Sequence, residues 1–156
     1  MRIAIIAVGR VRAGPLVELF QDYADRVTAT RVFGSVALHE VEERRKLSAA
    51  ELKLREADLL RAAIPKGALV VALDAGGESL SSDSFARRLA GWRDQGAGTL
   101  AFLIGGADGL DASLLHEAKA RLSLGAMTWP HLLVRVMLAE QLYRAATILQ
   151  GHPYHR

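Results

Sequence analysis

Three short segments rich in small residues could bind a ligand through main-chain atoms. DAGGESLSS follows Leu73, GGADGL follows Ile104 and GAMTWPH follows Leu124. Each comes directly after an apolar run, and glycines let a backbone approach a ligand closely and present N–H and C=O groups to it. A single such loop is typical of a tight turn. Three of them at equivalent strand ends favour a shared pocket, of a kind that could hold an adenine or a ribose.

Several other kinds of chemistry lack support in the sequence. GGADGL does not have the G-x-G-x-x-G spacing of dinucleotide-binding loops, and no Lys-Ser/Thr pair follows a glycine run as in a P-loop. The five histidines have no metal-ligand spacing, and the chain has no cysteine. No nucleophile elbow is present either. We therefore expect no metal site and no covalent catalysis, and an oxidoreductase function is disfavoured.

Few polar residues lie near the three loops. Arg135 and Glu140 stand in an otherwise apolar segment, where an unpaired buried charge is unfavourable, so we expect them to pair. Glu140 and Arg144 also have the i,i+4 spacing of a structural ion pair. His131 follows Pro130, where capping or packing explains it at least as well as ligand binding. Trp129 is either a core residue or a wall on which an aromatic ligand stacks.

The chain ends with the residues HPYHR, which include Tyr154, His155 and Arg156. Chain termini are commonly disordered. A proline and an aromatic residue within this one instead favour docking against the body of the protein.

The apolar periodicity predicts strands and helices in alternation. We expect strands at 2–8, 31–38, 68–73, 99–104 and 121–124, a charged loop at 40–46, and helices after Pro15 and at 48–64, 82–95, 110–119 and 131–150. Ser48 and Glu51 have capping-box spacing at the start of one helix. The alternation predicts an α/β fold with a mainly parallel sheet and helices on both faces, built as one domain over 1–156.

The last predicted helix is apolar around most of its circumference, whereas a surface helix needs only one apolar stripe. A sheet on one side and a second subunit on the other would cover it, so we expect a homodimer. The alternative is a helix enclosed entirely within one subunit.

Length, composition and charge indicate where this protein acts and what it could bind. The chain has 156 residues, a formal net charge of +3 and no segment long and apolar enough to span a bilayer. We expect a cytoplasmic protein without membrane contact. The modest excess of cations is compatible with a nucleic-acid partner. Arg10, Arg12, Arg44, Arg45 and Lys46 could contact an RNA backbone, although scattered surface charge is the stronger explanation of these residues.

The runs IGGADGL, LSLGAMTWPHLLVRVMLAEQLYRA and HPYHR, with the opening IAIIAVG and VALDAGGESLSS, closely resemble the ribosomal RNA large subunit methyltransferase H family of the SPOUT class. The resemblance covers essentially the whole chain. It implies a trefoil-knotted α/β fold, a homodimer, S-adenosylmethionine as cofactor, and methylation of N3 of a pseudouridine in helix 69 of 23S rRNA on the assembled ribosome.

The resemblance also implies site residues. The cofactor would be held by three segments: Leu73, Gly105 with Gly106, and the loop of Leu124, Gly125, Ala126, Met127, Thr128 and Trp129. Tyr154, His155 and Arg156 would face the substrate. We expect His155 to accept or polarise the N3 proton, Tyr154 to stack on or orient the base, and Arg156 to contact phosphate or carbonyl oxygen, with Arg135 as a second orienting residue. A ribosome-binding factor without turnover is the alternative function.

Overall fold

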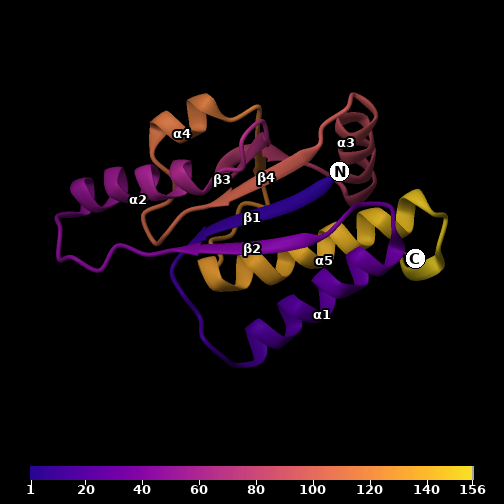
Figure 1. Ribbon diagram of the computed structural model, residues 1–156, viewed down its shortest axis with the longest axis horizontal. Helices are drawn as coiled ribbons and strands as arrows, with labels where there is room; N and C mark the ends of the chain where they lie inside the picture. The colour runs from indigo at the N-terminus through magenta and orange to yellow at the C-terminus, as the bar shows by residue number, and fades with distance from the viewer. Residues whose placement is uncertain (156) are drawn as a thin grey trace.

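The computed structural model describes residues 1–155, with side chains through Tyr154. Five strands and five helices alternate along the chain and a short 3₁₀ turn, η1 (Pro153–His155), ends it (Figure 1). The strands are β1 (Arg2–Val8), β2 (Val36–Val41), β3 (Leu69–Ser79), β4 (Thr99–Ile104) and β5 (Ala120–Ser123). The helices are α1 (Pro15–Thr30), α2 (Ala49–Ala63), α3 (Ser82–Asp94), α4 (Ala112–Glu117) and α5 (His131–Leu149).

The strands form one sheet in the order β2-β1-β4-β3-β5, and every neighbouring pair is parallel. Parallel strands place all of their carboxyl ends at one edge, which we call the carboxyl edge; the opposite edge is the amino edge. The three glycine-containing segments follow β4, β5 and the regular part of β3, so the sheet brings them to the carboxyl edge together.

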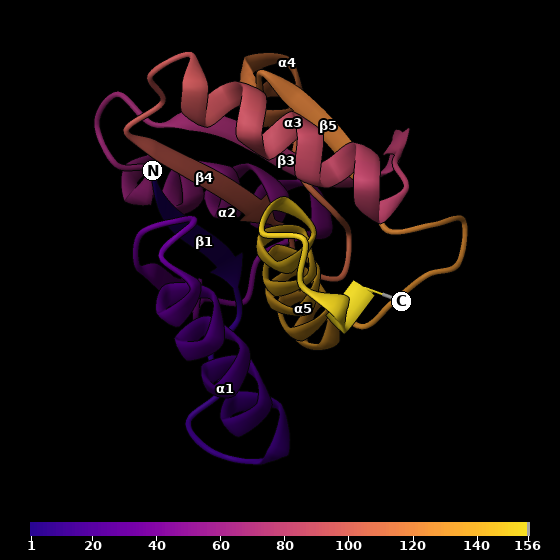
Figure 2. The same ribbon diagram turned by 90° about the vertical axis from the view of Figure 1, so that its right-hand side faces the viewer.

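Alternate residues of the central strands face two separate cores. On one face Ile3, Ile5 and Phe102 pack with α1, α3 and α5, and on the other Ile6 and Leu103 pack with α2 and α4. Figure 1 shows α2 and α4 on one side of the sheet and α1 and α5 on the other, and Figure 2 shows α1 running beside α5. The predicted parallel sheet with helices on both faces is confirmed.

One predicted strand, 31–38, was wrong in position. Helix α1 continues to Thr30, and Arg31 then takes a left-handed conformation with φ 59°. The apolar residues that suggested a strand include Phe33, which is buried at 3% exposure in the connection that follows. Strand β2 therefore begins only at Val36, and Glu40, expected in a loop, lies within it.

Strand β3 is longer than predicted and contains an irregularity. Both Leu73 and Glu78 are opposite Leu122 of β5, so the DAGG residues between them bulge from the sheet. A Cβ atom on Gly77 would lie 2.7 Å from the backbone of Leu122, so only glycine fits where the bulge returns to the sheet. The bulge carries Asp74 and Ala75 out at the carboxyl edge.

Candidate functional site

A cavity of about 360 Å³ opens at the carboxyl edge and lies within the size range of small-molecule sites. Three segments line it: 73–75 after the regular part of β3, 104–110 after β4, and much of 122–131 after β5. Val134 of α5 completes the wall. The three loops chosen from the sequence therefore meet around one space.

The loop after β4 is folded tightly on itself. The N–H of Gly109 donates to the carbonyl of Gly106 at 3.1 Å, and the two residues form an isolated antiparallel bridge. A Cβ atom on Gly105 would lie 2.6 Å from the carbonyl carbon of Gly109, a distance that real Cβ atoms do not tolerate. Glycine at 105 thus lets the backbone of this loop form the floor of the cavity.

The charge of the cavity is negative. Asp74 and Asp108 line it, and no Lys or Arg is among the described residues that do so. Glu56 of α2 lies beneath the loop, its carboxylate 3.1 Å from the position of a Cβ on Gly106. Partial burial, together with repulsion from Asp108, raises the pKa of Glu56. These carboxylates suit a cationic ligand and disfavour one that carries phosphate.

Two large apolar side chains stand at the rim. Met127 is 71% exposed and Trp129 is 37% exposed, and both line the cavity. Trp129 is thus not a core residue, which leaves the stacking wall as its better interpretation. His131 also lines the cavity, and desolvation together with the charge of Arg135 lowers its pKa. The imidazole is therefore neutral near pH 7.

Arg135 is only 3% exposed, and its two terminal nitrogens have partners within the protein while its buried Nε has none. Its Nη2 donates to the carbonyls of Val8 and Gly9 at 2.6 and 2.8 Å, and its Nη1 pairs with Glu40. Glu40 in turn accepts a hydrogen bond from the N–H of Val11 at 3.1 Å. The expected pairing of Arg135 with Glu140 was wrong, because its side chain is directed at the ends of β1 and β2. Its burial argues against direct contact with a substrate.

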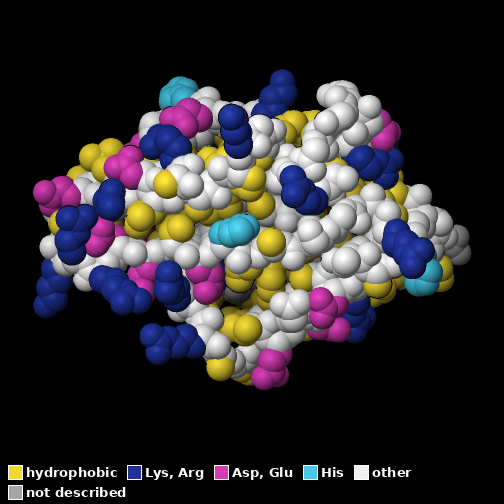
Figure 3. Space-filling model, in the orientation of Figure 1, with side chains coloured by type: hydrophobic (Ala, Val, Ile, Leu, Met, Phe, Trp, Pro, Cys, Tyr) yellow, Lys and Arg dark blue, Asp and Glu magenta, His cyan; other side chains and the backbone are white. Residues whose placement is uncertain are grey.

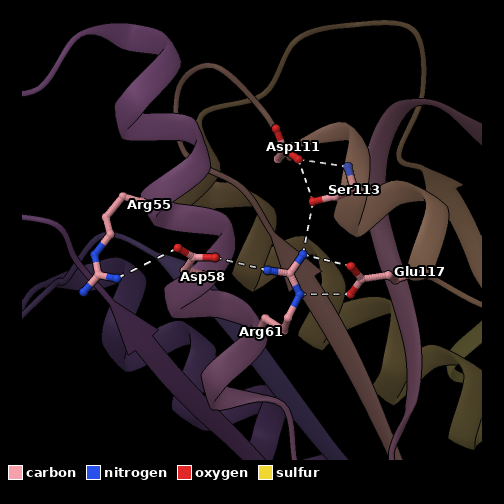
Figure 4. A network of polar contacts seen from close by, with 6 residues as sticks. All are labelled: Arg55, Asp58, Arg61, Asp111, Ser113 and Glu117. Atoms are coloured by element: carbon pink, nitrogen blue, oxygen red, sulfur yellow. Dashed lines mark hydrogen bonds and ion pairs between the residues drawn. The ribbon is translucent and has the colours of Figure 1, made fainter.

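A second polar network fixes the helix that follows the Gly105 loop (Figure 4). Arg61 of α2 donates to Glu117 of α4 at 2.8 and 3.1 Å and to Ser113 at 3.1 Å. Asp111 caps α4 by accepting from the N–H of Ser113 at 2.9 Å. This network holds α4 against α2, and so fixes the downstream end of the loop that forms the cavity floor.

The described part of the tail docks on the far end of α5. The ring of Tyr154 packs edge-on against Tyr143, with centroids 4.6 Å apart, and lies under the guanidinium of Arg144. Burial and the neighbouring Tyr23 and Glu140 raise the pKa of Tyr154 to about 12, so its phenol keeps its proton. The predicted Glu140–Arg144 ion pair is confirmed, at 2.6 Å.

A second and larger hollow, of about 540 Å³, lies between α1, α3 and α5. Its walls are mainly apolar, with Leu19, Phe85 and Met137 among them. We call it the apolar groove. It shares Leu73 and residues 122–125 with the cavity, so the loop after β5 separates the two spaces. The glycine-containing loop after β4 lines only the cavity, so the cavity is the candidate small-ligand site.

The structure brings most of the predicted cofactor residues together and leaves Tyr154 apart from them. Of the nine, the cavity is lined by Leu73, Gly105, Gly106, Leu124, Gly125, Met127, Thr128 and Trp129, while Ala126 lies in the same loop. The side chain of His155 and residue Arg156 lie outside the described part of the chain. Sequence reasoning missed Asp108, although GGADGL contains it. It also missed Glu56, which no local pattern marks.

The comparisons with known proteins define the class first. A family model described as "Predicted SPOUT methyltransferase" matches residues 1–155. Solved structures agree on the fold: a probable methylase family protein from Haemophilus influenzae has a TM-score of 0.56 at 15% identity, covering 99% of this chain and 70% of that one. A probable methyltransferase from Bordetella pertussis has a TM-score of 0.53 at 18% identity, with coverages of 92% and 95%.

Curated relatives give a narrower family. Proteins named "Ribosomal RNA large subunit methyltransferase H" from Dinoroseobacter shibae and Roseobacter denitrificans are 55% and 57% identical over 159 residues, covering 100% of this chain and 99% of each relative. One from Rhodospirillum centenum is 53% identical with the same coverage. The chain belongs to this family of SPOUT methyltransferases, and the predicted resemblance is confirmed.

No helix among the described residues is both long and apolar enough to cross a membrane. Nor does the described part of the chain hold a group of three or more His, Asp or Glu side chains placed to bind a metal ion.

Proposed function

We propose that this protein transfers the methyl group of S-adenosylmethionine to N3 of a pseudouridine in helix 69 of 23S rRNA, on the assembled ribosome. The observation that carries the proposal is the convergence of three glycine-containing loops around one acidic cavity in a chain of this family. The large-subunit rRNA as substrate rests on the names of the relatives.

The residues of the cavity fit this cofactor. A sulfonium and an α-ammonium group are cationic, which matches a cavity lined by Asp74 and Asp108 without any described Lys or Arg. The main chain around Gly105 and the loop after β5 can hydrogen-bond an adenosyl group, and Trp129 can shield it from water. When bound, the cofactor supplies a methyl group already activated for displacement.

The remaining work of the protein is positioning and proton handling. The two reacting atoms must be held in line, and an ordered site can supply a large part of the rate enhancement in this way. We propose that His155 accepts or polarises the N3 proton. Tyr154, which retains its own proton, is suited to orienting the base, and Arg156 to holding phosphate or carbonyl oxygen.

We further propose that the protein works as a homodimer and that each tail serves the cavity of the other subunit. Tyr154 packs on Arg144, which is thirteen residues beyond His131 on α5. At 1.5 Å per residue this separation is about 20 Å along the helix, so Tyr154 does not cover the cavity of its own subunit. The apolar groove adjoins both the tail, through Glu140, and the cavity, and a second copy seated there would bring tail and cavity together.

Two measurements test the function and the dimer. Ribosomes from a strain lacking the modification are incubated with the protein and labelled S-adenosylmethionine, and the rRNA is analysed by mass spectrometry. We expect one N3-methylpseudouridine in helix 69. Cofactor binding without methylation would favour a non-catalytic ribosome-binding factor. A monomer in light scattering would contradict the proposed homodimer.

Mixed dimers test which cavity each tail serves. A cavity variant, Gly105→Ala, is co-expressed with a variant truncated after His152, each inactive by itself. If tails act across the interface, random pairing restores about a quarter of the wild-type sites. If each tail serves its own cavity, no mixed dimer has a complete site and the mixture stays inactive.

A further inference from the structure

The cations at the carboxyl edge divide into two groups by their ion pairs. Arg44 pairs with Glu42 at 3.2 Å, and Arg45 pairs with Glu43 at 2.8 Å. Hydrogen bonds from Arg45 to Glu43 lower the pKa of Glu43 to about 2, so the Arg45–Glu43 pair stays ionised over the working pH range. The positive charge of these two arginines is largely compensated within the protein.

The second group has no such compensation. Arg10, Arg12 and Lys46 are exposed, and no ion pair is formed by any of them within the described part of the chain. The segment 9–14 that follows β1 has the sequence GRVRAG, which contains two arginines and no acidic residue. Figure 3 shows Lys and Arg side chains gathered at the left-hand end of the molecule, where the connections after β1 and β2 lie.

The segment with Arg10 and Arg12 begins beside the cofactor cavity. A Cβ on Gly9 would lie 3.2 Å from Nε2 of His131, which lines the cavity, and Arg10 is the next residue. The N–H of Gly9 donates to the carbonyl of Val41 at 2.8 Å, so the segments after β1 and β2 start side by side. Glu40 also holds the N–H of Val11, between the two arginines. The segment is therefore anchored by its backbone while its charged side chains face solvent.

We propose that Arg10, Arg12 and Lys46 form a phosphate-binding rim that holds the sugar-phosphate backbone of the substrate RNA next to the cavity. This inference rests on the proposed function and specifies where the RNA approaches. The rim and the cavity have opposite charge, so the RNA backbone is attracted to the rim and excluded from the cofactor site. Arg44 and Arg45 contribute less, because contact with RNA would require them to give up their carboxylate partners.

The parallel sheet supplies a matched control. Arg2, Arg31 and Lys66 precede or begin strands, so they lie at the amino edge, and all three are exposed. The rim triple variant is R10Q/R12Q/K46Q, and the control triple is R2Q/R31Q/K66Q. Each removes two Arg and one Lys charge, so the loss of net charge is the same and only the place differs.

The experiment measures the dissociation constant for assembled ribosomes between 50 and 200 mM salt, together with S-adenosylmethionine affinity. Each phosphate contact contributes about 0.7–0.9 to the slope of log affinity against log salt, so the rim triple should lower that slope by about 2. The affinity of the wild type should then fall about 15-fold more than that of the rim triple over this range. The control triple should match the wild type, and R10K/R12K should keep nearly the full slope.

Cofactor affinity should be unchanged in every variant. Equal slopes of log affinity against log salt for the rim and control triples would overturn the proposed phosphate-binding rim. So would a larger change of that slope in R44Q/R45Q than in the rim triple. Failure of the proposed function is a separate result: the wild type would then not methylate ribosomes at any salt concentration.

Discussion

The buried ion pair between Arg135 and Glu40 should be asymmetric in its response to mutation. Arg135 is 3% exposed as a residue, whereas the side chain of Glu40 is 22% exposed. Glu40→Ala leaves a buried cation without its counter-charge, which we expect to destabilise the fold by about 3–5 kcal/mol. Arg135→Met leaves a carboxylate that water can reach and that still accepts from Val11, so its cost should be smaller, about 1–3 kcal/mol.

The double variant Glu40→Ala/Arg135→Met distinguishes a coupled pair from two independent sites. Removing both charges removes the unpaired cation, so the double variant should be more stable than Glu40→Ala alone. The free energy of unfolding is measured by urea denaturation at one fixed protein concentration, since the proposed dimerisation would make stability depend on concentration.

The same variants should affect the cofactor site. Arg135 ties α5 to the carbonyls of Val8 and Gly9, and Gly9 lies against His131 of the cavity wall. Folded Arg135→Met protein should therefore bind S-adenosylmethionine more weakly than the wild type. If the double-variant destabilisation equals the sum of the two single values, the reasoning from an unpaired buried charge is refuted.

Three further predictions concern the cavity. Gly105→Ala places a Cβ within 2.6 Å of the Gly109 carbonyl carbon. Titration calorimetry should therefore show loss of cofactor binding in protein whose circular dichroism spectrum is native. Unchanged affinity would mean that this loop is not the floor of the site. Asp74→Asn should weaken S-adenosylmethionine binding by about fivefold, an electrostatic effect of about 1 kcal/mol. It should weaken S-adenosylhomocysteine binding less, because that product lacks the sulfonium charge. Asp25→Asn on α1 is the control, and equal losses of affinity for both ligands would contradict a charge effect. The pKa of His131 is lowered from 6.5 in the folded state, so the unfolded chain takes up a proton first as the pH falls. The free energy of unfolding should therefore decrease below about pH 6.5, and the decrease should be shallower in His131→Gln. Identical pH profiles of the two proteins would show that His131 does not contribute.

Local patterns were sufficient for the elements and for the loops of the site. Ser48 and Glu51 predicted a capping box, and the structure forms both of its hydrogen bonds. The three glycine-containing segments were found because each follows an apolar strand, and a parallel sheet must bring such segments to one edge. This inference needs only the order of the elements, which periodicity supplies.

Boundaries failed where tertiary packing overrides local preference. Phe33 and Val32 look like strand residues, but they pack in the connection between α1 and β2. The DAGG residues look like a loop, but β3 resumes after them because Glu78 and Ser79 pair with β5. Neither outcome is encoded in the neighbouring residues, since each depends on a partner distant in sequence.

The polar contacts that support the site were the least predictable part. Arg135 has Glu140 close by in sequence, yet it pairs with Glu40, ninety-five residues away, because α5 crosses the ends of β1 and β2. Glu56 reaches the loop of Gly106 only because α2 packs on the opposite face of the sheet from α5. Arg135 hydrogen-bonds glycine-containing backbone at the carboxyl edge from the α5 face of the sheet. On the α2 face, Glu56 lies against the loop of Gly106 and Arg61 fixes α4. The cavity is thus held from both faces of the sheet, which explains how a site built mainly from short loops can keep one shape.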